Sequence, residues 1–521
     1  MGEAPGGRGP QPPAEGSAAE RDCFGQLQAR LAPMFDRVFR DPKAPRTVVV
    51  VPSLSVDADV LAKISGVEHY EERMLCMLML LRYPHARLIY VTSLAIDPSI
   101  IDYYLHLLAG VPGRHARRRL HLLSCGDPTI HVPLSRKLLD RPAMLAALRE
   151  AIIDSDSAHM TCFNATPLER TLAVRLGIPL YACDPELLDL GTKSGSRKLF
   201  RESGVDVPDG FEDLRDAHDI AEALATLKQR HPELRRAVVK LNEGFSGDGN
   251  ALFPFEDVAA TAPTIAAALP TRLQFEARAE SWDGYIRKFE EMGGIVECFL
   301  QSPEIRSPSV QLRIDPRRQV ELISTHDQLL GGPSGQVFLG CAFPAASAYR
   351  CEIQRLGVKV AEAMRSGGVI GRFSVDFVSV RTPSGWRHFG LEVNLRKGGT
   401  THPYMMLQFL TDGVFDESSG LYHAPTGQPC YYYASDNLQH VEYRGLTPDD
   451  LIDIAVDRSL HFHAATQEGV VFHLLGALPE FGKVGIVCIA RTRDRANELY
   501  QETIRTLDEE AAARATGLSG S

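Results

Sequence analysis

The amino-acid sequence predicts a multidomain protein of the α/β and α+β classes, with a doubly wound parallel α/β domain at its N-terminal end. Strand-like and helix-like segments alternate between Arg46 and Leu190, which is typical of a parallel sheet covered by helices. An α+β stretch and a strand-rich stretch then extend to Gln408, and a smaller α+β unit follows. At 521 residues, the chain is long enough for about three or four domains.

The first predicted domain covers residues 23–190, after a leader at 1–22 that is rich in Gly, Pro and Ala and is expected to be disordered. A β-branched run from Arg46, RTVVVVPSLSV, indicates a fully buried parallel strand. The other predicted elements are a helix over Phe24–Arg40, a helix holding Tyr70–Leu81, and strands at Ala86–Leu94, His159–Thr166 and Ile178–Asp184.

The rest of the chain divides into predicted units at 191–300, 301–410 and 411–521. The first begins with helices after Gly191 and near Ala217–Arg230, and continues with strands such as RRAVVKLN and GGIVECFL. The stretch after Tyr404, which contains GQPCYYYASDN, is expected to be rich in loops. The last unit should contain a helix capped by Thr447, two strands (GVVFHLL and KVGIVCIAR) and a long helix.

Composition narrows the class of function. Hydrophobic content of 44% and charged content of 23% are those of an ordinary globular protein. A net charge of −10 with pI near 6.0 argues against a nucleic-acid protein held by a basic footprint. No stretch approaches the ~18 apolar residues of a membrane helix. Ten scattered cysteines without a CxxC pair favour reduced thiols and a cytoplasmic location.

The most informative segment is a hairpin from Gly371 to Pro403. With a two-residue period, Phe373, Val375 and Phe377 share one face with Leu391, Val393 and Leu395 across a Pro383-Ser384-Gly385 turn. The opposite face carries Arg372, Ser374 and Asp376, answered by Glu392, Asn394 and Arg396. Two carboxylates and a carboxamide suit a hard divalent cation. A solvent-facing polar strand would show the same alternation, so the hairpin alone leaves both interpretations open.

A glycine-rich loop follows a strand that ends in a lysine. Lys240 precedes Gly244, Gly247 and Gly249, and another strand comes next. Such loops let backbone N–H groups approach phosphate oxygens. Because this loop joins strand to strand, it is neither a P-loop nor a dinucleotide fingerprint, both of which open a helix. The two interpretations are a flap over a triphosphate and a plain turn.

The segment GGIVECFLQSPE suggests an adenine hinge. Backbone groups around Cys298–Leu300 could read the edge of an adenine ring, and Glu304 follows in position to accept hydrogen bonds from ribose hydroxyls. A core strand followed by a surface glutamate is the alternative.

In this order, the motifs resemble the ATP-grasp superfamily over roughly Leu188–Pro403. Lys193, which opens a helix after Gly191-Thr192, is similar to the first ATP-binding lysine, although a threonine precedes it in place of the usual acidic residue. The other motif positions that match are Lys240 with its loop (Ser246, Gly247 and Gly249), Glu297, Cys298, Leu300 and Glu304 at the hinge, Asp376, Glu392 and Asn394 as metal ligands, and Arg396 of a Glu-x-Asn-x-Arg motif.

The chain is more similar still to the branch of pheganomycin-type peptide ligases, in which a pre-ATP-grasp α/β domain precedes the catalytic module. VPSLSVD, YEER (residues 70–73), IDYYLHLL, GTKSGSRKLF, THDQLLGGPSGQVFLGCAFPA and the C-terminal GVVFHLLGALPEFGKVGIVCIAR carry this similarity. The resemblance implies a pre-ATP-grasp domain (23–190), small and large ATP-grasp lobes (191–300 and 301–410) and a C-terminal α+β unit.

The resemblance also implies a carboxylate–amine ligase that uses ATP with Mg²⁺, or Mn²⁺ as a substitute, and proceeds through an acyl phosphate. Lys193 and Lys240 would hold phosphates, and Arg396 would stabilise the transferring group. Arg313 and Arg372 are candidates to bind the acceptor carboxylate, with a purely structural role as the alternative for both. Expected partners are a small-molecule carboxylate and an amine or peptide, with no nucleic acid or membrane, and a homodimer is expected by analogy.

Two other functions fit the same motifs. An ATP-grasp kinase would phosphorylate its acceptor and stop, and a catalytically silent nucleotide-binding regulator would bind ATP without turnover. The identities of the acid and the amine cannot be deduced from the residues.

Overall fold

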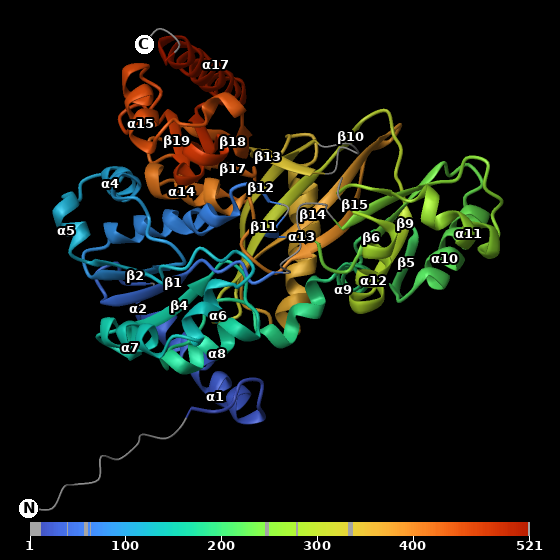
Figure 1. The fold of residues 1–521 in the computed structure, drawn as a ribbon, viewed down its shortest axis with the longest axis horizontal. Coiled ribbons are helices and arrows are strands. Elements are labelled where there is room, and N and C mark those ends of the chain that lie inside the picture. The colour runs from blue at the N-terminus through green and yellow to red at the C-terminus, as the bar shows by residue number, and fades with distance from the viewer. Residues whose placement is uncertain are drawn as a thin grey trace, which may run out of the picture.

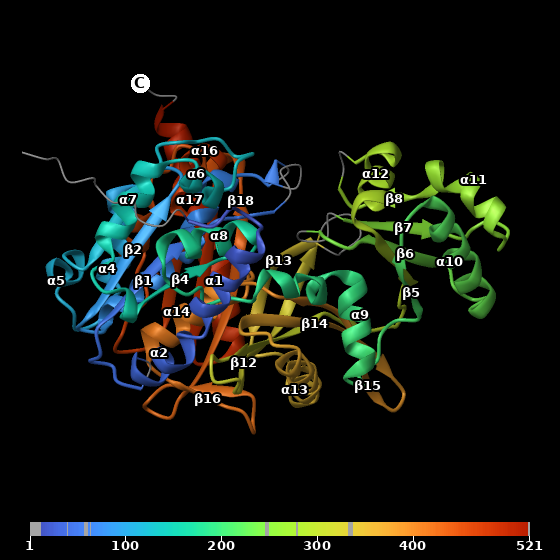
Figure 2. The ribbon, with the colours of Figure 1, turned by 90° about the horizontal axis from the view of Figure 1, so that it is seen from below.

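A computed structural model describes residues 12–38, 40–56, 61–62, 64–244, 249–277, 280–331 and 337–518. Figure 1 shows an N-terminal domain beside a long central sheet, a smaller lobe at the other end of that sheet, and a C-terminal unit next to the N-terminal domain. The view from below keeps the small lobe apart from the rest (Figure 2). Among the helices in the described ranges, none has the length and apolar character needed to cross a membrane.

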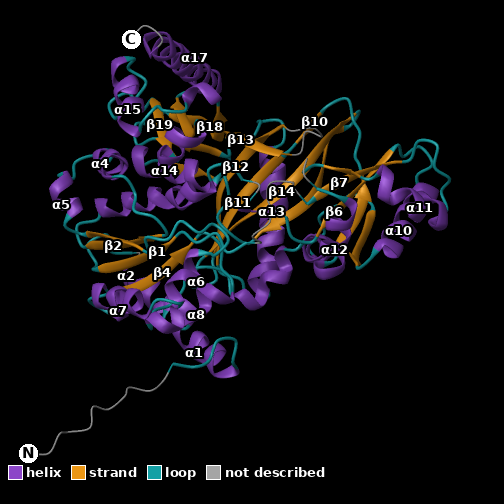
Figure 3. Cartoon of the chain, in the orientation of Figure 1, coloured by secondary structure: helices purple, strands orange, loops and turns teal. Residues whose placement is uncertain are grey.

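The N-terminal domain is built on a parallel sheet of strand order β3-β2-β1-β4. Val48, Val49, Val50 and Val51 of β1 are buried, as the β-branched run predicts, and helices lie on both faces (Figure 3). The predicted doubly wound domain is therefore confirmed. Its elements are α1 (Ala18–Gln28), α2 (Leu31–Val38), β1 (Arg46–Val51), the 3₁₀ helix η1 (Val67–Arg82), β2 (Ala86–Thr92), α4 (Pro98–His106), α5 (Gly113–Arg117), β3 (Leu120–Ser124), α6 (Leu134–Leu139), α7 (Pro142–Ala151), η2 (Ser155–Ser157), β4 (Ala158–Cys162), α8 (Pro167–Leu176) and η3 (Pro185–Gly191).

Three local predictions in this domain are wrong. The single helix expected over Phe24–Arg40 is two helices, and the first begins inside the supposed leader, at Ala18, where the Ser17 side chain accepts a hydrogen bond from the backbone of Glu20. Residues 178–184 form no strand: Leu180 makes only an isolated bridge with Met160. Pro179 has no N–H with which to extend that pairing.

The small lobe is an antiparallel sheet of order β5-β9-β6-β7-β8. Apolar residues of α10, α11 and α12 pack with the sheet in one core, which includes Leu224, Leu269 and Phe289. Its elements are α9 (Lys193–Glu202), β5 (Gly210–Leu214), α10 (Ala217–Arg230), β6 (Arg236–Leu241), β7 (Asn250–Pro254), α11 (Ala262–Arg272), β8 (Gln274–Phe275), α12 (Trp282–Met292) and β9 (Gly294–Cys298).

The large lobe and the C-terminal unit share one sheet. Strands run in the order β10-β14-β11-β12-β13-β18, with β15 on β14, β20 on β18 and β19 on β20. The elements of the lobe are β10 (Ile305–Arg306), β11 (Pro308–Ile314), β12 (Val320–Gly331), β13 (Val337–Phe343), α13 (Arg350–Ser366), β14 (Gly371–Thr382), β15 (Gly385–Asn394) and α14 (Thr401–Thr411). The following elements are β16 (Val414–Asp416), β17 (Leu421–His423), β18 (Pro429–Gln439), η4 (Val441–Tyr443), α15 (Pro448–Asp457), β19 (Gly469–His473), η5 (Leu475–Ala477), α16 (Leu478–Phe481), β20 (Lys483–Ala490) and α17 (Arg493–Leu518).

The stretch expected to be rich in loops after Tyr404 instead contains α14 and β18. In β18, Cys430, Tyr432 and Ala434 are buried while alternate residues are partly exposed, which is the strand periodicity that the run of tyrosines concealed. The predicted helix with Thr447 as its cap, the two strands and the long last helix are all present.

The C-terminal unit also packs against the N-terminal domain. Residues of η1 and α4 belong to the same apolar core as β18, β19, β20 and α17. The backbone N–H of Phe472 donates to the hydroxyl of Tyr103 at 2.9 Å, and that of Gly476 to Glu72 Oε2 at 3.1 Å. The N-terminal domain and the C-terminal unit are therefore joined by a shared core and by hydrogen bonds.

Candidate active site

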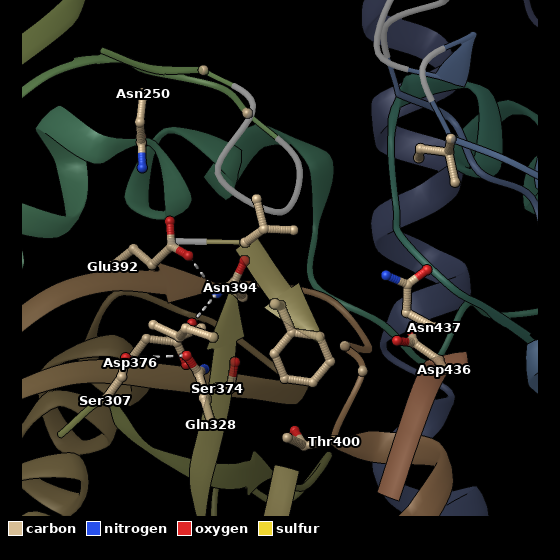
Figure 4. A pocket seen from close by; sticks show the side chains of 18 of the residues that line it. Asn250, Ser307, Gln328, Ser374, Asp376, Glu392, Asn394, Thr400, Asp436 and Asn437 are labelled. Carbon is tan, nitrogen blue, oxygen red and sulfur yellow. Dashed lines mark hydrogen bonds between the residues drawn. The ribbon is translucent and has the colours of Figure 1, made fainter. Parts of the chain in front are cut away.

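The polar hairpin face forms as the alternation predicts. In the β14–β15 ladder, Asp376 is the partner of Glu392 and Ser374 is the partner of Asn394. Phe373, Val375, Phe377 and Val393 lie in the core on the other face. The two carboxylates and the carboxamide therefore meet on one side of two adjacent strands (Figure 4).

The prediction that Leu391 belongs to the apolar face is wrong. The register shifts between Asp376 and Phe377, so that Phe377 is the partner of Gly390 and Leu391 is an extra residue. A bulge of this kind re-aims a side chain. Leu391 therefore lines a cavity beside Glu392 instead of joining the core.

The carboxylates are held in a way that suits a cation. Asn394 Nδ2 donates to Asp376 Oδ2 at 3.0 Å and to Glu392 Oε1 at 3.3 Å. The other oxygen of Asp376, Oδ1, is buried and has no hydrogen-bond partner in the described residues. Burial raises the pKa of Asp376 to about 6. An orphaned, buried carboxylate oxygen beside a second carboxylate and a rotatable carboxamide fits the all-oxygen ligand set of Mg²⁺.

Lys193 lies against this face. It is the first residue of α9, where the Thr192 side chain accepts from the backbone N–H of Gly195 at 2.9 Å. Its ammonium forms an ion pair with Glu392, and burial is the main reason that the pKa of Lys193 falls to about 7. Asn242, which the sequence motifs did not single out, fixes the start of α9 by accepting from the backbone N–H of Ser194 at 3.0 Å.

Lys240 approaches the same cavity from β6. Its Nζ lies 2.6 Å from Glu297 Oε1, and Arg197 Nη1 lies 2.8 Å from Glu297 Oε2. Each carboxylate oxygen of Glu297 therefore contacts one cationic side chain. This arrangement supports a role for Glu297 in positioning Lys240. Gly249 lines the cavity, whereas Ser246 and Gly247 fall outside the described residues.

The remaining predicted residues lie away from the cavity lining. Cys298 ends β9, Leu300 follows it, and Glu304 is exposed and pairs with Arg306 at 2.9 Å. Arg313 donates from Nε to Glu321 at 2.9 Å, and its strand partner is Arg372. Neither arginine belongs to the residues that line the cavity.

The cavity has a volume of about 420 Å³ and is wider than the predicted motifs suggest. Near Lys193 and Lys240 it is lined by Asp376, Glu392, Asn394 and Arg396. Burial first and the neighbouring Arg73 second lower the pKa of Arg396 to about 10, while Asp376 acts in the opposite direction. Other polar residues also line the cavity, although the sequence motifs assign no role to them: Tyr70, Arg73, Ser307, Gln328, Ser374, Asp436, Asn437, Gln439 and Lys483.

A second cavity of about 210 Å³ adjoins the first and shares Lys193, Leu241, Gly249, Asn394 and Arg396 with it. Its far side is formed by residues after β1 and β4, among them Ser55 and Asn164. These two residues hold each other, since Asn164 Nδ2 donates to the Ser55 carbonyl at 2.9 Å and Ser55 N donates to Asn164 Oδ1 at 3.1 Å. The carboxyl ends of the N-terminal sheet therefore face the ATP-grasp-like motifs.

Comparisons with known proteins identify the family of this chain. A family model described as "IQCH-like, ATP-grasp" matches residues 185–265 and 263–418, and one described as "PGM1 C-terminal domain" matches residues 450–503. The L-propargylglycine–L-glutamate ligase of Streptantibioticus cattleyicolor is 31% identical over 465 residues, which cover 87% of this chain and 92% of that protein.

More distant relatives share less. The IQ motif-containing protein H of Danio rerio is 25% identical over 66% of this chain, but the match spans only 36% of that protein. Among solved structures, biotin carboxylase from Campylobacter jejuni superposes with a TM-score of 0.52 at 12% identity, covering 87% of this chain and 89% of the other. That likeness shows the fold.

Proposed function

Since this chain belongs to the ATP-grasp carboxylate–amine ligases, in the pheganomycin-type branch, we propose that it joins a small-molecule carboxylic acid to an amine or peptide amine and converts ATP to ADP and phosphate. The observation that carries the proposal is the meeting of Asp376, Glu392 and Asn394 with Lys193 and Lys240 on the wall of one cavity. The S. cattleyicolor relative is named for a reaction of this kind.

The reaction takes two steps. A carboxylate oxygen of the acid attacks the γ-phosphorus of ATP, the bond from that phosphorus to the β,γ-bridging oxygen breaks, and ADP leaves. The amine nitrogen then attacks the carbonyl carbon of the acyl phosphate, loses a proton and expels phosphate as the amide forms. Phosphoryl transfer depends on positioning and charge neutralisation more than on covalent help from the protein.

The residues of the cavity supply both. Mg²⁺, or Mn²⁺ in its place, would neutralise phosphate charge when held by Asp376, Glu392 and Asn394. Lys193 and Lys240 bind phosphate oxygens, and Lys193 exchanges its contact with Glu392 for one with the nucleotide. Arg396, between the phosphate end and the far end of the cavity, binds the transferring phosphoryl group or the acyl phosphate.

The remaining assignments differ in their support. Residues 299–304 connect the end of β9, at Cys298, to β10 of the large lobe, which is consistent with adenine at Cys298 and Leu300 and ribose at Glu304. Arg313 and Arg372 lie off the cavity lining, so their positions favour the structural role. We also propose a cytoplasmic location, in which the ten cysteines stay reduced, and a homodimer.

The test uses hydroxylamine as a general acceptor. The full chain is incubated with ATP, Mg²⁺, hydroxylamine and a panel of amino acids and other carboxylic acids, while hydroxamate, ADP and phosphate are followed. A ligase of this type forms all three in equal amounts with at least one acid. A phosphate ester or another phosphorylated product that is stable to hydroxylamine, formed without phosphate release, would instead identify a kinase, and nucleotide binding without any product would identify a silent regulator. Because hydroxylamine also attacks free acyl phosphates, a parallel incubation with an amino acid in place of hydroxylamine must yield the amide.

Glu392→Ala tests the metal assignment in the same assay. The variant should lose turnover and keep its fold, since Glu392 lies on the cavity wall and not in the core. Glu362→Ala, which removes an exposed carboxylate that pairs with Arg365 on α13, is the matched control and should keep full activity. Full activity in Glu392→Ala would reject the assignment.

A further inference from the structure

The cavity has a second charged end, away from the phosphate lysines. It is formed by Tyr70 and Arg73 of η1 and by Asp436 and Lys483 of the C-terminal unit. Figure 4 shows Asp436 and its neighbour Asn437 across the cavity from the metal-binding face. Neither the metal nor the ATP phosphates of the proposed reaction require these groups.

Arg73 and Asp436 are fixed in place by burial and by each other. Their side chains form an ion pair, and they are only 7% and 12% exposed. The guanidinium carbon of Arg73 also lies 4.9 Å from the centre of the Tyr70 ring and 5.5 Å from that of Phe163. This end of the cavity therefore presents one carboxylate and one guanidinium in a rigid arrangement.

Lys483 adds a positive charge that no carboxylate contacts directly; the charge of Asp436 acts on Lys483, but Asp436 is already paired with Arg73. Lys483 is 3% exposed, and its ammonium donates to the Tyr70 hydroxyl at 2.9 Å and to the Ser65 carbonyl at 3.2 Å. Within the part of the chain that the structure describes, it forms no ion pair. Burying an ammonium without a counter-charge is costly. A buried cation on a cavity wall, paired only with neutral oxygens, indicates an anionic ligand group.

We propose that this end of the cavity binds the charged head group of an amino-acid substrate, with its α-ammonium on Asp436 and its α-carboxylate on Lys483 and Arg73. One carboxylate beside two cations is complementary to a zwitterion, whereas a simple acid or a simple amine would leave part of the set unpaired. The inference rests on the proposed ligase function, because it makes this end the place from which a substrate extends past Arg396 to the metal-binding face.

The same head group could belong to the acid or to the amine that is joined. Both sources share the chemistry that Asp436, Arg73 and Lys483 recognise, so the experiment separates them. Because the α-carboxylate and the α-ammonium are held at this end, the group that reacts belongs to the side chain. An amino acid that is converted to its side-chain hydroxamate in the presence of ATP and hydroxylamine is the acid substrate, whereas a hydroxamate at the α-carboxylate would contradict the inference. One that gives no hydroxamate, but replaces hydroxylamine as acceptor with another acid, is the amine substrate.

Binding is measured apart from turnover, by calorimetric titration of the full-length Glu392→Ala protein with each of the standard L-amino acids. At least one should bind, and its analogues without the amino group or with a carboxamide in place of the α-carboxylate should bind about tenfold more weakly or worse, because each loses a charge-assisted hydrogen bond. Adding Asp436→Asn should abolish the preference over the des-amino analogue, and adding Lys483→Met the preference over the carboxamide.

The control is Asp412→Asn, which removes the carboxylate of an exposed Arg–Asp pair, Arg82–Asp412, outside the cavity; both preferences should persist. Binding of Mg-ATP should be the same in all these proteins. If Lys483→Met fails to fold, the inference is tested by the affinities of the two analogues for the Glu392→Ala protein alone.

The inference fails if no amino acid binds, if the analogues bind as tightly as the amino acid, or if folded Asp436→Asn and Lys483→Met proteins keep both preferences. The two proposals can fail separately. Hydroxamate formation from acids that are not amino acids, with no amino-acid binding, would remove this inference and keep the ligase. Amino-acid binding with the predicted preferences, but no product in the wild-type protein, would keep this inference and remove the ligase proposal.

Discussion

Lys240 Nζ and Glu297 Oε1 lie 2.6 Å apart on neighbouring strands, and both side chains are almost fully buried, with 8% and 3% of their surface exposed. The same carboxylate accepts from Arg197, which anchors α9 to the sheet of the small lobe. Glu297 thus connects the strand that carries Lys240 to the helix that begins with Lys193.

Glu297→Gln is therefore expected to lower the free energy of unfolding by about 3–5 kcal/mol, since removing one partner of a buried pair leaves the other charge uncompensated. Urea unfolding measures this change, and the affinity for ATP should fall in the fraction that remains folded. Asp213→Asn, in the exposed pair with Lys198, should change stability by less than about 1 kcal/mol. Equal effects of the two substitutions would contradict the role given to Glu297.

Chelation of Mg²⁺ with EDTA should stop ADP formation, and excess Mg²⁺ should restore it. Asp376→Asn should raise the Mg²⁺ concentration for half-maximal rate by about tenfold or more, because a charged ligand is lost. Asp449→Asn, at an exposed position in α15, serves as the control and should leave the Mg²⁺ requirement unchanged.

Asp376→Asn should also leave the metal-free protein at least as stable as the wild type at pH 7. The buried carboxylate has its pKa raised to about 6, so its charged form is disfavoured in the folded state and the neutral carboxamide removes that penalty. A large drop in the melting temperature would mean that Asp376 is a structural residue and not a metal ligand.

Gly340→Ala should weaken the junction between the large lobe and the C-terminal unit. A Cβ at Gly340 would lie 2.2 Å from the carbonyl oxygen of Ala434 on β18, and the backbone there cannot move without breaking the ladder. The expected loss is about 1–3 kcal/mol of unfolding free energy. Gly25→Ala, in α1 with open space around it, should instead stabilise the protein by about 0.5–1 kcal/mol; a neutral Gly340→Ala would contradict the tight junction.

Acid should destabilise the protein below pH 6.5 through histidines that are buried in the neutral form. Burial lowers the pKa of His326 to about 3, and that of His473 likewise to about 3. Because the folded-state pKa is depressed, the stabilisation is complete above the unfolded-state value near 6.5, declines as the pH falls below it, and is lost by the folded-state value. Each histidine should contribute a loss of about 1.4 kcal/mol between pH 7.5 and 5.5.

Urea unfolding at those two pH values checks this for His326. His326→Gln keeps an acceptor for the Tyr432 hydroxyl, which lies 2.6 Å from Nε2, and should reduce the pH-dependent loss by the contribution of one histidine. His218→Gln, whose side chain is 73% exposed, should not change it. An unchanged pH dependence in His326→Gln would contradict a neutral buried imidazole.

Much of the face proposed to bind the metal could be predicted from the sequence, because it depends on local alternation. Asp376 and Glu392 pair as expected once the turn at Pro383-Ser384 sets the register. The bulge that re-aims Leu391 could not be predicted, because the sequence alternation does not reveal where one strand has an extra residue. Glu297 was placed at a hinge by motif spacing alone, and only the three-dimensional structure shows that its oxygens belong to Lys240 and Arg197.

The far end of the cavity could not be predicted from the sequence, for a different reason. Tyr70 and Arg73 lie more than three hundred residues from Asp436 and Lys483 in the sequence, and no local pattern records that η1 will pack against β18 and β20. The run of tyrosines in β18 also alternates between faces without alternating in polarity, so its strand character was missed.

The continuity of the central sheet with β18 and β20 has a consequence for how the protein matures on the ribosome. Domains of a nascent chain fold as they emerge, from the N-terminal end onward. When Arg396 has left the exit tunnel, all the residues proposed to bind the nucleotide and the metal are outside it, whereas Asp436 and Lys483 have yet to emerge. With the roles proposed for these residues, a nascent chain acquires its ATP-binding groups before it acquires the groups that select the substrate.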